Sequence, residues 1–456
     1  MLSAKSLPGY ILEVRRRFVC GIAIIVLIII GGLCALSLKS GSNTYEGKPL
    51  AFWLAEADAM QPQDRREAAA KALRAMGPRL IPKLLADLDP HESFVHRWGR
   101  WLAQKQNFVK LQLRSPDTRM RQAVWAFDAL GANAAPAIPE IVKLLDGAAG
   151  YAPGALVGVG EPALPAIQQA LSHTNRYVRG NLGVSLANAL EAGRFPREPT
   201  RLFIPVLLRN LTDTNDSVRW NTASALGSIH LEPALCIPEL VKALSDPDPE
   251  VQTRCGQALS RFGDAAAEAL PTILQLYEGA RSDRRLTLCN SVKNFHSAPN
   301  LVVPFLVRAL ADSDATVRMY AASSLGQLAQ LPEMAIPPLI NALQDANELV
   351  RLNAVKAIGN FVENSDGPVP TSVAESLERR TTLSAACIPA LSNALRDSHE
   401  HVRFTAATAI GKFQADGSKA IPALLDAVGD SSEKVRGNAT NALMRISPAA
   451  LRRRGQ

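Results

Sequence analysis

The stretch that decides the fold is V-V-P-F-L-V-R-A-L-A-D-S-D-A-T-V-R-M-Y-A-A-S-S-L-G, residues 302–326, which recurs in recognisable copies along the chain. The proline of each copy stands 33 residues from the next in two runs: Pro205, Pro238, Pro271, Pro304 and Pro337, then Pro389 and Pro422. A fixed period of this length indicates a repeat protein. Weaker copies near Pro82, Pro139 and Pro165 bring the total to about ten.

Each copy has the pattern of two helices. The proline suits the first turn of a helix, because it lacks an N–H group and its φ is fixed, and the L-x-x-A-L that follows forms an apolar stripe. An Asp eight residues after the proline marks the end of this helix, and V-R followed by A-A-x-A-L-G marks a second one. Small residues such as Ala321, Ala322 and Gly326 let helices approach closely. Because one pair cannot bury its apolar face alone, the sequence predicts an all-α fold, an α-solenoid of about ten stacked helical hairpins.

This pattern resembles HEAT repeats, and among them the short bacterial HEAT-like type named after phycobilisome lyases. The residues that carry the resemblance are I-P-x-L-x-x-A-L, the Asp and V-R-x-x-A-A-x-A-L-G, repeated in register over about residues 70–447. The segment Y-E-G-K-P-L-A-F-W-L, Tyr45 to Leu54, is similar to the lead-in of membrane-anchored bacterial HEAT-repeat proteins. The resemblance implies a solenoid whose second helices line the concave side.

The chain divides into five segments, and the solenoid carries three insertions. The segments are a basic N-terminus (1–17), a transmembrane helix or uncleaved signal anchor (18–38), a lead-in (39–69), the solenoid (70–447) and a basic tail (448–456). The spacing between prolines widens where insertions are expected: near 89–115, 190–200 and 362–386. A Gly-rich stretch from Gly147 to Gly160 predicts a repeat that has lost much of its second helix.

The anchor prediction rests on F-V-C-G-I-A-I-I-V-L-I-I-I-G-G-L-C-A-L-S-L, Phe18 to Leu38, which is 21 residues long and uncharged. One helix of this length crosses a bilayer. Because Arg15, Arg16 and Arg17 precede it, the positive-inside rule predicts a single-pass protein with a cytoplasmic N-terminus and repeats outside, periplasmic in a bacterium. A cleaved secretory signal is the alternative, since Ala35-Leu36-Ser37 is a loose cleavage site.

Composition excludes some classes and leaves nucleic acid weakly supported. With 47% hydrophobic residues, the chain is not disordered. The net charge is +8, but four bases and one acid precede residue 18, which leaves 46 bases against 41 acids, or +5, in the remainder. So small an excess does not indicate a phosphate-binding surface. Nucleic acid is therefore not expected as a partner. The corresponding alternative function is a nucleic-acid-binding solenoid that resembles HEAT-like DNA glycosylases.

An Arg and an Asp recur at fixed places in the repeats. The Arg stands fourteen residues after the proline and the Asp eight: Arg219, Arg318, Arg351, Arg403 and Arg436 with Asp213, Asp312, Asp345, Asp397 and Asp430. The resemblance implies that these side chains pair and tie the turns together as a structural ladder. The alternative is a row of bases that holds phosphates.

The second helices offer a candidate binding surface. Positions 16, 19 and 23 after the proline share one helical face and do not follow the apolar consensus. Amides and bases align there across repeats, with large apolar side chains at position 15. We expect a groove that binds a protein or peptide partner through Trp220, Asn221, Arg254, Arg261, Asn294, Tyr320, Asn353, Lys356, Asn360, Phe404 and Lys412. A solvated helix face that binds nothing is the alternative.

The first insertion combines aromatic residues with bases. Between Phe94 and Arg114 there are five bases and no acids, interleaved with aromatic side chains. A helix of this kind either caps the open end of the solenoid or lies on an anionic membrane surface. Single-stranded nucleic acid is a third possibility. The residues that would carry these roles are Trp98, Arg100, Trp101 and Lys105.

Enzyme chemistry finds little support in the sequence. A di-iron hydroxylase built of HEAT-like repeats places His-Glu pairs just after V-R, where this chain has pairs such as Trp220-Asn221 and Leu352-Asn353. His399-Glu400 and His91-Glu92 lie elsewhere. Bilin lyase activity has no short sequence motif that could be checked, so it remains an alternative. We therefore expect a binding protein with no catalytic residue, cofactor or metal.

The cysteines beyond the anchor follow the repeat register. Cys236 and Cys387 stand where other repeats have Ala before the proline, and Cys255 and Cys289 stand in the Ala-Ala pair of the second helix. Cysteines that replace Ala in tight packing are expected to be buried and unpaired, although an oxidising compartment favours disulfides.

Overall fold

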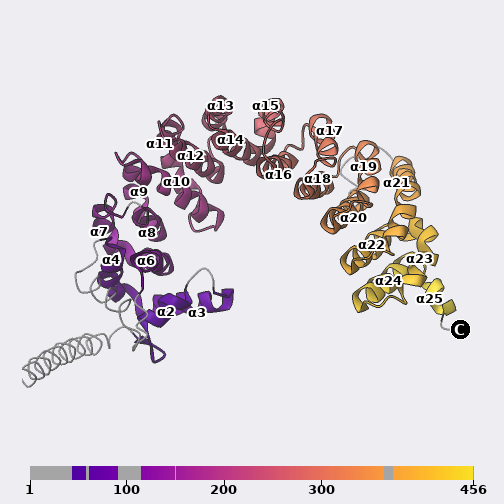
Figure 1. Cartoon of the computed structure of the whole chain (residues 1–456), viewed down its shortest axis with the longest axis horizontal. Coiled ribbons are helices and arrows are strands. Elements are labelled where there is room, and N and C mark those ends of the chain that lie inside the picture. Colours follow the sequence, from indigo (N-terminus) through magenta and orange to yellow (C-terminus); the bar gives the residue numbers. More distant parts are fainter. Residues whose placement is uncertain (1–43, 58–60, 91–113, 149, 364–372, 455–456) are drawn as a thin grey trace, which may run out of the picture. The chain divides into compact units, whose positions relative to one another are not determined.

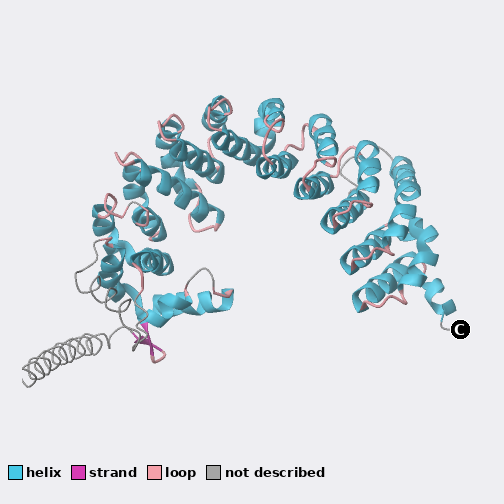
Figure 2. Ribbon diagram, in the orientation of Figure 1, coloured by secondary structure: helices cyan, strands magenta, loops and turns pink. Residues whose placement is uncertain are grey.

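The computed structural model describes residues 44–57, 61–90, 114–148, 150–363 and 373–454. It forms two compact units, Met1–Ser185 and Leu186–Gln456. Helices dominate the described residues of both units, and the strands among them form one short hairpin (Figure 2).

Unit 1 opens with a small folded lead-in. Strands β1 (Thr44–Tyr45) and β2 (Lys48–Pro49) pair antiparallel, and helices α2 (Leu50–Glu56) and α3 (Gln63–Met76) follow. Trp53 is buried, and its indole N–H donates to the Tyr45 carbonyl at 3.2 Å. Residue 70, where the sequence pattern starts the solenoid, lies inside α3.

Three first helices of unit 1 are each followed by a second helix. The pairs are α4 (Ile81–Leu88) and α6 (Pro116–Leu130), α7 (Ile138–Lys143) and α8 (Ala152–Gly158), and α9 (Leu164–Ala170) and α10 (Arg176–Glu191). Short 3₁₀ segments precede the first helices: η2 (Gly77–Leu80), η3 (Gly131–Ala137) and η4 (Glu161–Ala163). Helix α8 has only seven residues, so the prediction of a shortened second helix in the Gly-rich repeat is confirmed. Helix α10 runs across the boundary between the units.

The described part of unit 2 contains seven helical hairpins. They are α11 (Ile204–Asn210) with α12 (Asp216–Ile229), α13 (Pro233–Ala243) with α14 (Pro249–Phe262), α15 (Leu270–Gln275) with α16 (Ser282–Ser291), α17 (Pro299–Ala309) with α18 (Ala315–Leu328), α19 (Pro332–Ala342) with α20 (Glu348–Glu363), α21 (Val373–Ala394) with α22 (Glu400–Lys412), and α23 (Ile421–Ala427) with α24 (Glu433–Ile446). The other segments are η5 (Glu198–Phe203), η6 (Gly263–Ala269), η7 (Val292–Asn294), η9 (Gln414–Ala420) and α25 (Pro448–Arg454). Within unit 2, the second helices follow the inner side of the curve and the first helices the outer side (Figure 1). The predicted all-α solenoid is confirmed.

The repeat proline starts the first helix in only some repeats. Helices α11, α15 and α23 begin one residue before it, after a 3₁₀ segment. Helices α13, α17 and α19 begin five residues earlier, at a second proline such as Pro299, so that Pro304 lies inside α17. The third insertion lengthens α21, which has 22 residues and contains Pro389. A proline inside a helix removes one i→i−4 hydrogen bond, so the backbone hydrogen bonding of these first helices is interrupted at the repeat proline.

Close packing between neighbouring second helices explains the glycine near the end of α12 and of α18. A Cβ atom on Gly326 would lie 2.5 Å from the Ala357 Cα of the next second helix, and one on Gly227 would lie 2.8 Å from the Ala258 Cα. Only glycine fits at such a distance. The predicted close approach through small residues is confirmed.

The four cysteines that the structure describes are free and buried. Burial raises the pKa of the Cys255, Cys289 and Cys387 thiols to about 12 and that of Cys236 to about 11. Thiols of this kind are inert packing groups, because the thiolate is the reactive form.

The predicted single-pass membrane localisation needs correction. Among the residues that the structure describes, no helix combines the length and the apolar character needed to cross a bilayer. The segment 18–38, on which that prediction depended, lies outside the described residues.

Candidate functional site

The repeated Arg and Asp side chains form ion pairs between successive repeats. Arg318 donates from Nε to Asp345 Oδ2 at 2.7 Å and from Nη2 to Asp345 Oδ1 at 2.9 Å. Its Nη1 donates to the carbonyl oxygen of Asp312 at 2.8 Å. Each Arg therefore holds the turn of its own repeat and the carboxylate of the next repeat at once.

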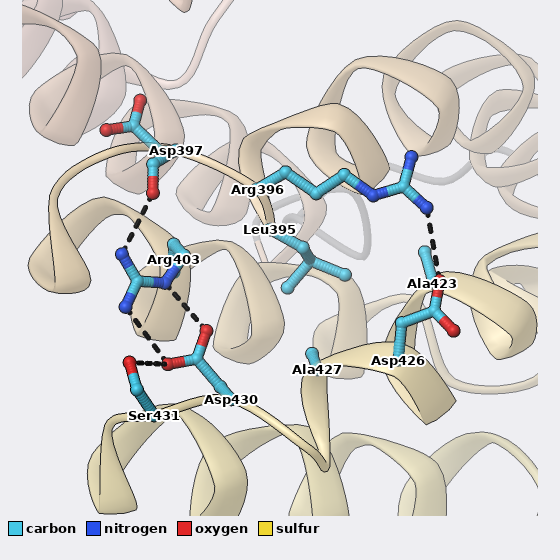
Figure 3. A pocket seen from close by; sticks show the side chains of 9 residues that line it. All are labelled: Leu395, Arg396, Asp397, Arg403, Ala423, Asp426, Ala427, Asp430 and Ser431. Atoms are coloured by element: carbon cyan, nitrogen blue, oxygen red, sulfur yellow. Dashed lines mark hydrogen bonds and ion pairs between the residues drawn. The ribbon is translucent and has the colours of Figure 1, made fainter.

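We call this series the turn ladder, and it repeats with nearly constant geometry. The Nε–Oδ2 distance is 2.7 Å in Arg219–Asp246, Arg285–Asp312, Arg351–Asp397 and Arg403–Asp430. Figure 3 shows Arg403 between Asp397 and Asp430. Arg436 donates to the carbonyl of Asp430 at 2.9 Å, and the carbonyl of Asp213 accepts from Arg219 at 2.9 Å. The ladder is interrupted at one joint, where Gln252 replaces the Arg and Gly279 the Asp.

The electrostatics of the turn ladder favour structure over ligand binding. The hydrogen bond from Arg318 lowers the pKa of Asp345, and the one from Arg403 lowers the pKa of Asp430, in both cases against desolvation. Desolvation also opposes the shift at Asp312, but hydrogen bonds from Arg285 and Tyr277 lower its pKa to about 2. The guanidinium edges already face carboxylate or carbonyl oxygens, so this row offers little to a phosphate.

A polar hollow of about 390 Å³ lies beside the ladder at its C-terminal end (Figure 3). Its lining is Leu395, Arg396, Asp397, Arg403, Ala423, Asp426, Ala427, Asp430 and Ser431. Arg396 pairs with Asp426 at 3.1 Å, and Arg403 pairs with Asp430. Asp397, the third acid, pairs with Arg351 outside the lining, so every charge that lines the hollow already has a partner.

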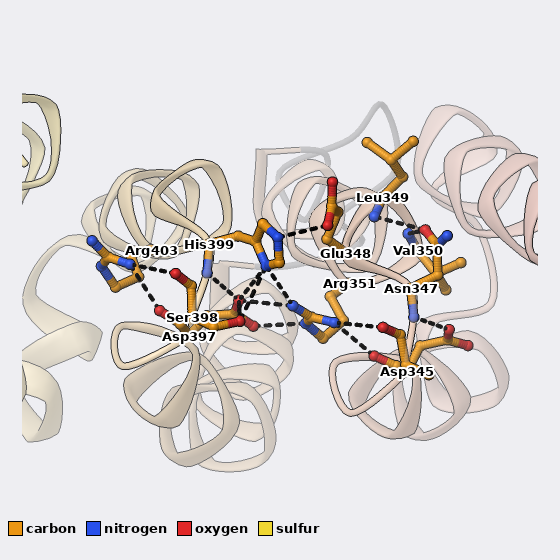
Figure 4. A network of polar contacts seen from close by, with 11 residues as sticks. Asp345, Asn347, Glu348, Leu349, Val350, Arg351, Asp397, Ser398, His399 and Arg403 are labelled. Carbon is orange, nitrogen blue, oxygen red and sulfur yellow. Dashed lines mark hydrogen bonds and ion pairs between the residues drawn. The ribbon is translucent and has the colours of Figure 1, made fainter.

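His399 of the His399-Glu400 pair forms polar contacts beside the turn ladder. His399 Nε2 lies 2.6 Å from Glu348 Oε2, and its Nδ1 lies 3.2 Å from Arg351 Nη2 (Figure 4). Its partner is thus Glu348 of the preceding repeat and not Glu400. Within the residues that the structure describes, no group of three or more His, Cys, Asp or Glu side chains is placed to hold a metal ion.

The predicted binding residues lie on the second helices of unit 2, or on the 3₁₀ turn that extends one. We define the inner face as the side chains 12, 15, 16, 19 and 23 residues after each repeat proline in this unit. It includes Trp220 and Asn221 of α12, Arg254 and Arg261 of α14, Asn294 of η7, Tyr320 of α18, Asn353, Lys356 and Asn360 of α20, and Phe404 and Lys412 of α22. All of them are at least partly exposed.

Part of the inner face is used within the scaffold. Position 23 reaches across to the preceding second helix: Asn360 donates to the Gly326 carbonyl at 3.2 Å, and Lys412 Nζ lies 3.0 Å from Glu363. Arg261 likewise donates to Ser228 Oγ at 2.9 Å and pairs with Glu191. These side chains hold neighbouring repeats together in addition to any contact with a partner.

Other side chains of the inner face form few polar contacts with neighbouring repeats. Asn353 bonds only within its own helix, to the Leu349 carbonyl at 2.8 Å. The rings of Phe404 and His401 lie tilted against each other, with centroids 5.4 Å apart and planes at 54°. Trp220 is less available than expected, because it is half-buried and Arg254 lies 5.9 Å from its ring. Its indole N–H is buried without an acceptor among the described residues.

The sequence analysis did not single out Leu349 and His401, which occupy position 12 of the inner face. Leu349 is 48% exposed and lies one turn before Asn353. Leu349 could have been identified by comparing position 12 across the repeats, because other repeats have a polar residue at this position, such as Thr316 or Lys434. The residues of the first insertion, Trp98, Arg100, Trp101 and Lys105, lie outside the described residues.

Comparison with known proteins agrees with this architecture. A family model for HEAT repeats matches residues 204–293, 303–381 and 360–444, which together make about half of the chain. No curated protein matches the sequence.

Solved structures with a similar fold include karyopherins. Kap95p in a complex with RanGDP is 14% identical with a TM-score of 0.51, over 92% of this chain and 62% of that one. Yeast importin-β (Kap95p) is 14% identical with a TM-score of 0.50, over 93% and 63%, and Kap121p bound to the SUMO protease Ulp1p is 14% identical with a TM-score of 0.51, over 87% and 48%. The chain thus spans about three-fifths of the length of Kap95p. The sequence match and the stacked hairpins agree, and the chain belongs to the HEAT-repeat family.

Proposed function

We propose that the chain is a scaffold that binds an extended segment of a protein partner along the inner face of unit 2. The observation that carries the proposal is the contrast in how side chains are used. Arg and Asp of the turn ladder are consumed by contacts between repeats, whereas Leu349, Asn353 and Lys356 of α20 stay exposed or half-exposed and form no hydrogen bond or ion pair with another repeat among the described residues.

The chemistry of this face suits a peptide. The amide of Asn353 offers a donor and an acceptor to the backbone of an extended chain. Leu349, Leu352 and Phe404 offer apolar surface between them, and burial of such surface supplies the main driving force of association. The amides would orient an extended protein segment, and the apolar side chains would supply affinity for it.

The similar solved structures support the proposal by analogy of fold. Kap95p was solved with RanGDP and Kap121p with the protease Ulp1p, so solenoids of this architecture hold protein partners. No specific observation on this chain favours an enzyme or a nucleic-acid binder instead. Binding without bond-making is therefore the function we propose.

A site-specific photo-crosslinker tests the proposal in cells. It replaces Leu349 on the inner face or, as a matched control, Leu301 on α17, which is 45% exposed on the first-helix layer. We expect one protein to be captured from position 349 and not from 301. Equal capture from both positions, or capture from 301 alone, contradicts the proposal.

A further inference from the structure

Basic side chains gather on the inner face of the last three second helices. Lys356 of α20, Lys434 and Arg445 of α24 are exposed, and none of the three has an ion-pair partner among the described residues. Lys412 of α22 is the fourth, with its pair to Glu363. Lys434, near the start of α24, lies about three turns from Arg445, and we call Lys356, Lys412 and Arg445 the basic cluster.

The packing of the repeats brings these bases together. A Cβ atom on Gly359 of α20 would lie 3.3 Å from Lys412 Nζ, which shows that Lys412 reaches across from α22. Gly359 is one turn after Lys356 on the same helix. Arg445 reaches from α24 in the same way, since a Cβ atom on Gly411 would lie 3.8 Å from its Cδ. Three helices therefore contribute positive charge to adjoining surface.

The other end of the same face has its bases neutralised. Arg254 Nε lies 2.8 Å from Glu250 Oε1. Arg261 pairs with Glu191. On α20, α22 and α24, by contrast, the five inner-face positions of each helix contain no acid. The only nearby acids on these helices are Glu363 at the end of α20 and Glu348, Glu400 and Glu433 in the first turns.

From this charge pattern we infer that the bound segment is acidic, with Asp or Glu side chains that meet the basic cluster. The inference rests on the proposed function and specifies its partner. Carboxylates of a partner complete the ion pairs that the chain itself completes for Arg254 and Arg261 of α14. Leu352 and Phe404, at position 15 beside the cluster, favour apolar residues between the acids of the partner.

A random library of displayed short peptides, selected with the full chain, tests this inference. We expect the selected peptides to be enriched in Asp and Glu and to bind more weakly as salt rises. The double variant Lys356→Glu/Arg445→Glu is expected to weaken their binding roughly tenfold, because each exposed pair is lost and replaced by repulsion. Lys419→Glu/Lys242→Glu, outside the inner face, is the control and is expected to retain binding.

The outcomes separate the inference from the proposed function. Selected peptides that lack acids, but lose binding with Leu349→Glu, overturn the acidic-partner inference and leave inner-face binding intact. Peptides whose binding survives both Leu349→Glu and the charge reversals contradict the proposed function as well. Selective capture of single-stranded oligonucleotides through the basic cluster, with no acidic peptide selected, overturns the inference in favour of nucleic acid.

Discussion

The turn ladder and the inner face of unit 2 belong to the same repeats but differ in how constant their residues are. At the ladder one Arg and one Asp recur from repeat to repeat, and each pair has the same 2.7 Å contact. On the inner face the residue at position 15 changes from Trp220 to Met319 to Phe404. The constant pairs fit a role in stability that most joints share, and the variation at position 15 fits the proposal that the inner face is adapted to a partner.

The largest effect is expected when a ladder pair is broken. Arg318→Ala leaves the largely buried carboxylate of Asp345 without its partner and is expected to cost about 3 kcal/mol of unfolding free energy. Lys356→Ala, on the inner face, is expected to cost less than about 0.5 kcal/mol. Chemical denaturation of both variants measures the contrast. Equal losses would remove the distinction between the two regions.

A close helix contact gives the next effect. Gly326→Ala forces a Cβ atom against the backbone of Ala357 and is expected to destabilise the fold by about 2 kcal/mol. Gly437→Ala is the matched control in α24, where nothing lies within 4 Å of the added atom. It is expected to stabilise the helix by about 0.5–1 kcal/mol. A similar outcome for both substitutions would contradict the packing described between α18 and α20.

The turn ladder also predicts an acid dependence of stability. Because the pKa of Asp312 is lowered to about 2 in the fold, the unfolded chain takes up this proton at higher pH. The stabilisation is complete above about pH 4 and is lost as the pH falls toward 2. Asp312→Asn is expected to flatten this part of the pH profile, measured by thermal melting. Asp426→Asn, an exposed control, is expected to keep the slope.

The smallest effect concerns a turn between repeats. Ala329 ends α18 with a φ of +47°, whereas Gly263 has the same register position after α14. Ala329→Gly removes the cost of the left-handed conformation and is expected to raise stability by about 0.5–1 kcal/mol. A loss of stability would show that this turn is held by other contacts.

The sequence predicts the stacked hairpins and the exposed rows, because both depend on a period that is visible in one chain. It does not predict which repeat a ladder Arg pairs with, since Arg318 lies six residues from Asp312 and 27 from Asp345. Nor does it show that Asn360 bonds to the Gly326 carbonyl, because that contact depends on the distance between helices. Helix starts such as that of α17 follow from a second proline, Pro299, outside the repeat pattern.

Partner capture by two matched surface variants tests most directly whether the inner face binds a partner and the turn ladder serves stability. Leu349→Glu/Asn353→Ala alters the inner face, and Arg396→Ala removes an exposed ion pair beside the turn ladder. Both are expected to melt close to the unaltered chain. The inner-face variant is expected to lose the crosslinked partner and the Arg396 variant to retain it. Undiminished capture by the inner-face variant, or loss with Arg396→Ala alone, would contradict it.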